Sequence, residues 1–141
     1  MLLPSENTLF KIAALGFGLI CGIAIIAFME QINIYLHPVP ELSDMQSEDF
    51  ETFYTNNHIY LIGSLISHAA GSFFAGAIPL YFKPDVRPIH TVFIALILIV
   101  LSSFNLYSVN YPAWYWVANL ILYVPLVLTG ATFAKKINSN Q

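Results

Sequence analysis

Residues that could exchange protons or bind a small solute interrupt several apolar stretches of this sequence. One of them, LIGSLISHAAGSFFAGAIPL (residues 61–80), contains Ser64 and, one helical turn later, His68. Histidine titrates near neutral pH, so His68 could accept a proton or anchor a ligand by hydrogen bonding. Other polar side chains stand within or at the end of the remaining apolar stretches: Glu30, Ser102, Asn105 and Asn119.

The sequence lacks the motifs of common catalytic and metal sites. It has no Cys-x-x-Cys, no HExxH, no GxSxG, no paired intramembrane aspartates and no paired histidines at helical spacing. Its single cysteine, Cys21, excludes an internal disulfide and a multi-cysteine metal site. We therefore expect no enzymatic activity, no metal and no cofactor.

The composition indicates whether water or lipid surrounds the protein. The 141 residues are 57% hydrophobic and only 9% charged, whereas an ordinary soluble domain is about 25% charged. The mean hydropathy is +0.70. We therefore predict an integral membrane protein whose main partner is the lipid bilayer. The net charge of −3 and the lack of a basic stripe argue against nucleic acid as a partner.

Four apolar stretches have the length of a transmembrane helix, about 20 residues. They cover residues 9–29, 59–82, 89–109 and 113–134. The first is too long for a cleaved signal peptide and is followed by no small-residue cleavage site, so we expect it to be retained as a span. We predict an all-α fold, an integral membrane four-helix bundle that forms a single domain over residues 1–141.

The basic residues indicate the orientation of these spans. Lys11 lies at the start of the first span, Lys83 and Arg87 lie between the second and third, and Lys135 and Lys136 follow the fourth. All five therefore fall on one side of the bilayer. Since cytoplasmic loops carry an excess of Lys and Arg, we predict that both the N and C termini are cytoplasmic.

The opposite side receives the loop of residues 30–58, which is acidic and has no Lys or Arg. Within it, LSDMQSEDFETFY predicts a short amphipathic helix, with Ser43 and Gln46 as a capping box and Asp44 near the helix N-terminus. The acidic residues and His37 could form a cation site. Because no spacing matches a calcium or zinc loop, we favour a solvated acidic helix face.

Small residues occupy one face of the stretch 61–80, and bulky residues occupy the other. Small faces let helix backbones approach closely in a bilayer. The candidate helix-packing residues here and in the first span are Ala14, Gly18, Gly22, Gly71, Ser72, Ala75 and Gly76. The GxxxG pair Gly18 and Gly22 fits packing within the chain, which we favour, or the seam of a homo-oligomer. His68 shares the small face, so we expect it to point into the bundle.

The polar side chains could meet in the outer half of the membrane. At about 1.5 Å per residue, His68 lies about 14 Å from the outer end of its span, Ser102 about 8 Å and Asn119 about 9 Å. One hypothesis is a polar pocket or water-filled vestibule that opens outward. It would be lined by Ser64, His68, Ser102, Asn105 and Asn119, with Glu30 at its rim. The alternative is a set of interhelical hydrogen bonds, worth ~0.6 kcal/mol each, that only fix helix register.

Aromatic residues gather at the predicted outer ends of the third and fourth spans. They are Tyr107, Tyr111, Trp114, Tyr115 and Trp116. Tyrosine and tryptophan are enriched where a membrane meets water, so this group predicts an interfacial belt. Tyr115 also aligns with Asn119 and Tyr123 on one face of the fourth span, which predicts a helix contact face there.

The order of several segments resembles a known group of proteins. The segments are HPVP, SDMQSEDFETFY, SHAAGSFFAGAIPLYF and YPAWYWVANLILYVPLVLTGATFAKK. In this order they resemble small, uncharacterised bacterial inner-membrane proteins with four transmembrane helices. The resemblance implies the bacterial inner (cytoplasmic) membrane and a four-helix bundle, and it brings no catalytic residues.

Two functions from different classes remain open at this point. The sequence favours a structural or accessory protein that binds a membrane-protein partner, a second copy or a lipid through its small helix faces and acidic loop. The alternative is a small transporter or channel-like ligand carrier that uses the polar cluster around His68.

Overall fold

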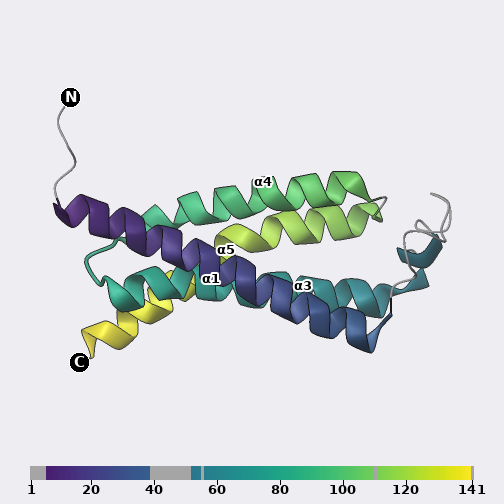
Figure 1. The fold of residues 1–141 in the computed structure, drawn as a ribbon, viewed down its shortest axis with the longest axis horizontal. Coiled ribbons are helices and arrows are strands. Elements are labelled where there is room, and N and C mark those ends of the chain that lie inside the picture. Colours follow the sequence, from purple (N-terminus) through teal and green to yellow (C-terminus); the bar gives the residue numbers. More distant parts are fainter. Residues whose placement is uncertain (1–5, 39–51, 55, 110, 141) are drawn as a thin grey trace.

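The computed structural model describes residues 6–38, 52–54, 56–109 and 111–140, and the regular elements among them are all helical. In chain order these are α1 (Glu6–Leu36), α3 (His58–Phe82), the 3-10 helix η2 (Pro88–Thr91), α4 (Val92–Ser108) and α5 (Ala113–Ser139). With η2 joined to α4, four helices are long and apolar enough to cross a membrane. This confirms the predicted all-helical architecture with four helices that fit membrane spans. Successive long helices run antiparallel, and the start of α1 and the end of α5 lie at the same end of the bundle (Figure 1).

The first helix is longer than the sequence analysis predicted. We expected the span to end at Met29, but α1 continues to Leu36 and therefore includes Glu30. Glu30 and Gln31 are good helix formers. A charged residue can also continue a membrane helix when its side chain faces the neighbouring helices and not the lipid. The helix ends shortly before Pro38, as expected from the restricted backbone of a residue that precedes proline.

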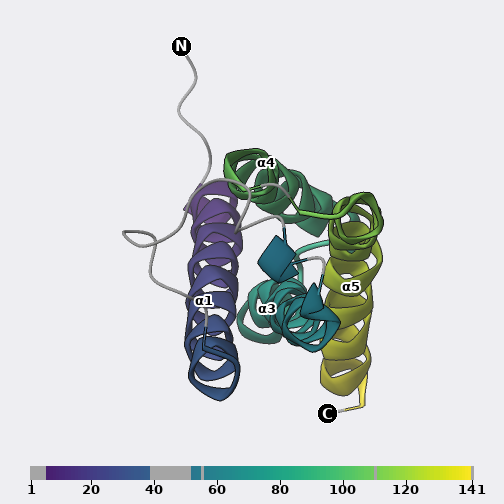
Figure 2. The same cartoon turned by 90° about the vertical axis from the view of Figure 1, so that its right-hand side faces the viewer.

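The four helices pack in the order α1, α3, α5, α4, and α3 occupies the centre (Figure 2). The most extensive contacts are those of α3 with α1 and with α5, whereas α4 packs mainly on α5. Helix α1 makes few contacts with α4. It buries only Gly18, Gly22 and Asn33. The bundle is therefore closely packed around α3 and loosely closed between α1 and α4.

Glycine and alanine make the close contact between α1 and α3. A Cβ atom on Gly22 would lie 2.5 Å from the Cβ of Ala75 and 2.9 Å from the carbonyl oxygen of Gly71, and one on Gly18 would overlap Pro79. Ala75 is fully buried. The Gly18 and Gly22 pair thus packs within the chain, because its face is already occupied by α3.

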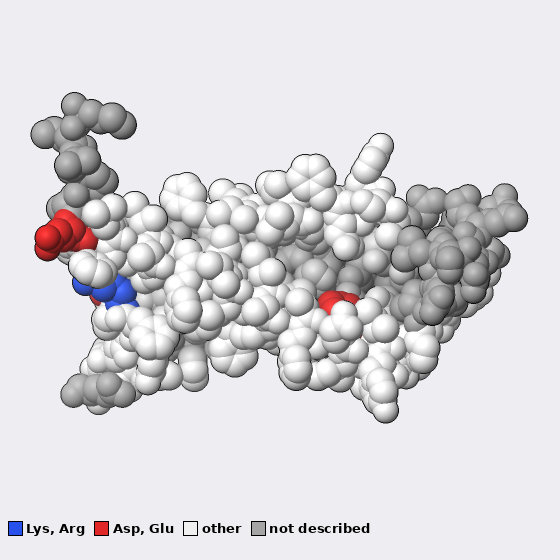
Figure 3. Space-filling view, viewed as in Figure 1, with Lys and Arg blue, Asp and Glu red and all other residues white. Residues whose placement is uncertain are grey.

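All five basic residues lie at the end of the bundle that holds the termini and the α3–η2 connection (Figures 1 and 3). There the Asp85 carboxylate pairs with Lys11 at 3.1 Å and with Lys83 at 3.3 Å. Partial loss of hydration opposes ionisation of Asp85, but the hydrogen bonds and attraction from the two lysines hold its pKa below the usual value. We refer to this end as the basic end.

At the opposite end, most of the acidic loop lies outside the described residues. The predicted capping box of Ser43 and Gln46, and the acidic helix face next to it, belong to that part of the chain. Residues 52–54 are described and form a helical turn, and the Tyr54 side chain is 5% exposed.

Candidate functional site

Each of the four long helices contributes to a polar region in the half of the bundle away from the basic end. Every candidate site residue from the sequence analysis belongs to one of these helices: Glu30 to α1, Ser64 and His68 to α3, Ser102 and Asn105 to α4, and Asn119 to α5. The small face of α3 turns Ser64 and His68 toward the other helices. The structure thus brings these residues into two hydrogen-bonded groups and one cavity.

His68 connects α3 with α5 and α1. Its Nδ1 atom lies 2.5 Å from the hydroxyl oxygen of Tyr123, and either atom can be the donor, depending on the histidine tautomer. Its Nε2 atom lies 3.9 Å from Oε1 of Glu30, which is too far for a hydrogen bond. The Oε1 atom is buried and accepts no hydrogen bond from any described residue. Glu30 and His68 therefore form a close but unbonded pair.

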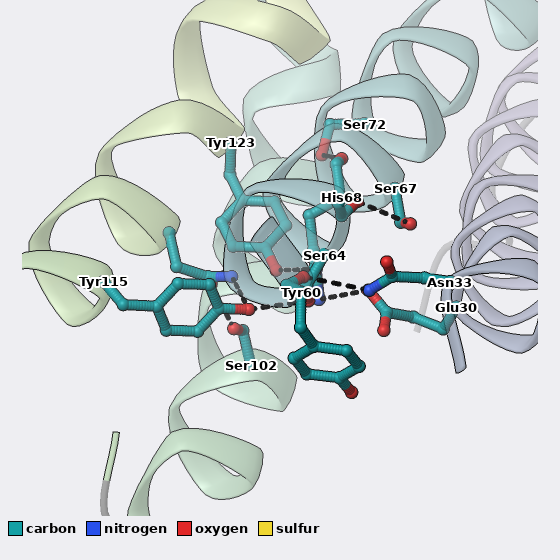
Figure 4. A network of polar contacts seen from close by, with 12 residues as sticks. Glu30, Asn33, Tyr60, Ser64, Ser67, His68, Ser72, Ser102, Tyr115 and Tyr123 are labelled. Carbon is teal, nitrogen blue, oxygen red and sulfur yellow. Dashed lines mark hydrogen bonds and ion pairs between the residues drawn. The ribbon is translucent and has the colours of Figure 1, made fainter. Parts of the chain in front are cut away.

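A second group of hydrogen bonds joins α3, α4 and α5 (Figure 4). The Ser102 hydroxyl donates to the side-chain oxygen of Asn119 at 2.5 Å. The amide nitrogen of Asn119 donates to the Tyr115 hydroxyl at 3.4 Å, and that hydroxyl lies 2.7 Å from the Ser64 hydroxyl. Because these side chains are buried and satisfy one another, this group fixes how the three helices pack.

Three members of the network were not among the predicted site residues. Asn33 donates from Nδ2 to the backbone carbonyl of Tyr60 at 3.0 Å, which ties α1 to α3. Tyr115 and Tyr123 were predicted only as part of a helix contact face and an aromatic belt. Asn33 lies three residues beyond Glu30, so continuing the helical period beyond Met29 would have placed both on one face.

A cavity of about 180 Å³ lies beside His68. His68, Ser102, Asn105 and Tyr123 provide its polar lining, and isoleucine and leucine side chains of α1 and α4 provide the rest. Ser64 is buried outside this lining. Asn105 is exposed, and its side chain makes no hydrogen bond to another described residue.

The cavity opens on the face of the molecule between α1 and α4. Figure 3 shows a hollow on this face with one acidic side chain at its edge, far from the charges of the basic end. Glu30 is not a lining residue of the cavity, but its Oε1 atom lies 3.9 Å from Nε2 of the lining residue His68. The opening is therefore lateral, through the weakly contacting pair of helices, and an acidic residue stands beside it.

Aromatic side chains close the end of the bundle next to this polar region. The rings of Tyr54 and Tyr111 lie 4.7 Å apart, and those of Tyr111 and Tyr115 lie 4.9 Å apart. Burial raises the pKa of both Tyr54 and Tyr111, so their phenols remain neutral at physiological pH. Tyr115 is only 2% exposed and belongs to this buried cluster, as expected for the predicted contact face of the fourth span and not for the interfacial belt. Its hydroxyl group, bonded to Ser64, compensates for that burial.

Comparison of the chain with models of protein families, with curated proteins and with solved structures found no match. The resemblance to small bacterial four-helix membrane proteins therefore remains a prediction. Function must accordingly be inferred from the geometry of the polar region and its cavity.

Proposed function

We propose that this protein is a membrane-embedded carrier that binds a small solute in the cavity beside His68. The single observation that carries the proposal is the cavity itself, about 180 Å³ in volume, which opens on the side of an apolar bundle and has four polar side chains among its lining residues. An engineered cavity of about 150 Å³ holds benzene, so this one has room for a comparably small ligand.

The distribution of hydrogen bonds supports a binding role. Polar groups inside a membrane are expensive unless they are paired, and those that face a cavity commonly mark a solute pathway. The Ser102 and Asn119 pair is satisfied within the protein. The Asn105 amide, by contrast, lines the cavity and has no hydrogen-bond partner among the described residues. A bound solute would supply that partner.

The proposal includes the membrane and the orientation predicted from the sequence. The protein would lie in the bacterial inner membrane, with the basic end and both termini in the cytoplasm. The cavity would then lie in the outer half of the bilayer and open sideways between α1 and α4. A solute would enter from the outer half of the membrane, not along the bundle axis, which the aromatic cluster closes.

A structural or accessory role is the second candidate. It is favoured by the mutual pairing of Ser64, Tyr115, Asn119 and Ser102, because such hydrogen bonds can serve only to fix helix register. Under this alternative the protein would bind a membrane-protein partner or a second copy, and the cavity would stay dry.

Cysteine labelling distinguishes the two functions. In a Cys21→Ser background, Ser102→Cys places a thiol on the cavity wall, and Ser103→Cys places one at the same depth outside the cavity. Small water-soluble methanethiosulfonates react with the thiolate, which forms only where water is present. The carrier proposal expects labelling at position 102 that is at least about tenfold faster than at position 103. Equally slow labelling at both positions would favour the structural role.

A further inference from the structure

The carboxyl group of Glu30 lies beside His68 inside the bundle, away from the Lys and Arg residues of the basic end. The Oε1 atom of Glu30 is shielded from solvent and has no hydrogen-bond donor among the described residues, and His68 Nε2 is 3.9 Å away. The Glu30 side chain is 19% exposed, and the polar side chains of Ser64, Ser67 and Asn33 lie near its carboxyl group. An ionised carboxylate without a counter-ion is costly in the apolar part of a membrane, so this position favours either the neutral acid or a bound cation.

The surrounding helices supply no positive charge. Among the described residues, the other ionisable side chains near the pair are tyrosines: Tyr54, Tyr60 from α3, and Tyr115 and Tyr123 from α5. Within described helix α4 the only ionisable side chain is Tyr107, which is 86% exposed at the far end of the helix. All five Lys and Arg residues lie at the basic end, and the face drawn in Figure 3 has no Lys or Arg away from that end. Only a cation from outside the protein can replace the proton.

We propose that the Glu30 and His68 pair exchanges one proton for one small organic monocation bound in the cavity. This inference rests on the proposed carrier function and specifies its ligand. The carboxyl group of Glu30 is neutral while the cavity contains no cation. When a cation enters, the O–H bond of Glu30 breaks, the carboxylate stays behind the lining residue His68, with its Oε1 atom 3.9 Å from Nε2, and one proton leaves to water.

The lining favours an organic cation over a metal ion. Hard metal cations require about six or more oxygen ligands, whereas the cavity offers few oxygens, those of Ser102, Asn105 and Tyr123, among aliphatic walls. A methylated ammonium group needs no such shell. Its methyl groups can pack on isoleucine and leucine, and its charge can interact with the carboxylate and with the face of an aromatic ring.

His68 and Tyr123 provide a path for the released proton. When Nδ1–H of His68 donates to the Tyr123 hydroxyl, the Nε2 lone pair is free to accept the proton of Glu30. The Nε2 to Oε1 distance must first shorten from 3.9 Å by about 1 Å to form a hydrogen bond. The imidazole then passes its Nδ1 proton to Tyr123 as the Tyr123 hydroxyl proton moves to water in the cavity, which Tyr123 lines. His68 is thus a relay, and Glu30 is the exchanging group.

The test measures proton release and binding on the same protein. Full-length protein in zwitterionic lipid nanodiscs, weakly buffered with a pH-indicator dye, is titrated with tetramethylammonium chloride. Sodium chloride controls for ionic strength, and tert-butanol controls for a neutral molecule of similar size. We expect release of about one proton per bound tetramethylammonium, because one carboxyl group is ionised. Neither control compound should release protons.

Matched variants assign the proton. Glu30→Gln should abolish the release, whereas Glu6→Gln, the same change at an exposed residue, should leave it intact. His68→Gln should slow the release by about tenfold or more in stopped-flow measurements, and His58→Gln should not. Because Glu30→Gln could affect folding, infrared difference spectra of the wild-type protein give a second measurement. A protonated carboxyl band should be lost when tetramethylammonium binds.

The outcomes separate this inference from the proposed function. Binding of tetramethylammonium with no proton release and no change in the carboxyl band would overturn the exchange and leave the carrier function standing. Proton release that persists in Glu30→Gln would overturn the assignment to Glu30. Slow labelling of Ser102→Cys together with an absence of tetramethylammonium binding would overturn both.

Discussion

The contact between α3 and α5 depends on a glycine that a single methyl group would displace. A Cβ atom on Gly76 would overlap the carbonyl oxygen of Val127 and lie 2.7 Å from its carbonyl carbon and 2.9 Å from its Cα. These atoms belong to the backbone and cannot rotate away. Gly76→Ala should therefore force the two helices apart. Gly130 makes the reciprocal contact, against the backbone of Phe73.

The expected loss of stability in Gly76→Ala can be estimated, and Gly16→Ala provides a control in the same chain. Overpacking costs about 1–3 kcal/mol, and a clash with backbone belongs at the upper end of that range. Replacing glycine by alanine within a helix returns about 1 kcal/mol. We expect Gly76→Ala to lower the free energy of unfolding by about 2 kcal/mol. In Gly16→Ala, the new Cβ has no neighbour within 4 Å, so only the higher helix propensity of alanine should act. The free energy of unfolding should therefore stay equal or rise.

Both variants can be measured by reversible unfolding in mixed micelles with increasing SDS. The two tryptophans, Trp114 and Trp116, report the transition by fluorescence. The difference between the two variants is the quantity of interest, because it removes the common effect of the Gly→Ala change. If Gly76→Ala proved as stable as Gly16→Ala, the close approach of α3 and α5 would be wrong, and with it the placement of the site.

Two further predictions concern the ion pair at the basic end and the buried hydrogen bonds. Because Asp85 has a depressed pKa in the folded protein, its pairs with Lys11 and Lys83 stabilise the fold above pH ~4, the ordinary aspartate value, and this contribution is lost as the pH falls through the folded pKa. Thermal melts should show wild type above Asp85→Asn near pH 7 and a shrinking gap on acidification; a constant gap would contradict the pairing. A double-mutant cycle of Ser102→Ala and Asn119→Ala should give a coupling energy of about 0.6 kcal/mol, and at most about 1.7 kcal/mol. Strictly additive losses would show that the two side chains do not interact.

The sequence alone was sufficient to predict the helices and their packing surfaces. Long apolar stretches predict spanning helices because the backbone must satisfy its own hydrogen bonds in lipid. The small face of residues 61–80 placed His68 inside the bundle, since glycine, alanine and serine permit close helix contact there. Both signals are local, so they can be read from one segment at a time.

Only the tertiary structure decided what His68 meets. The end of a helix depends on its neighbours as well as on its own residues, so the extension of α1 past Met29, and the position of Glu30 beside His68, could not be found from charge alone. The same holds for Tyr115, which the sequence placed both in an interfacial belt and on a helix contact face, and which the structure buries against Ser64. The lateral cavity depends on which helix pair packs poorly. Whether such a cavity remains depends on how the side chains of all four helices pack together, so no single helix sequence determines it.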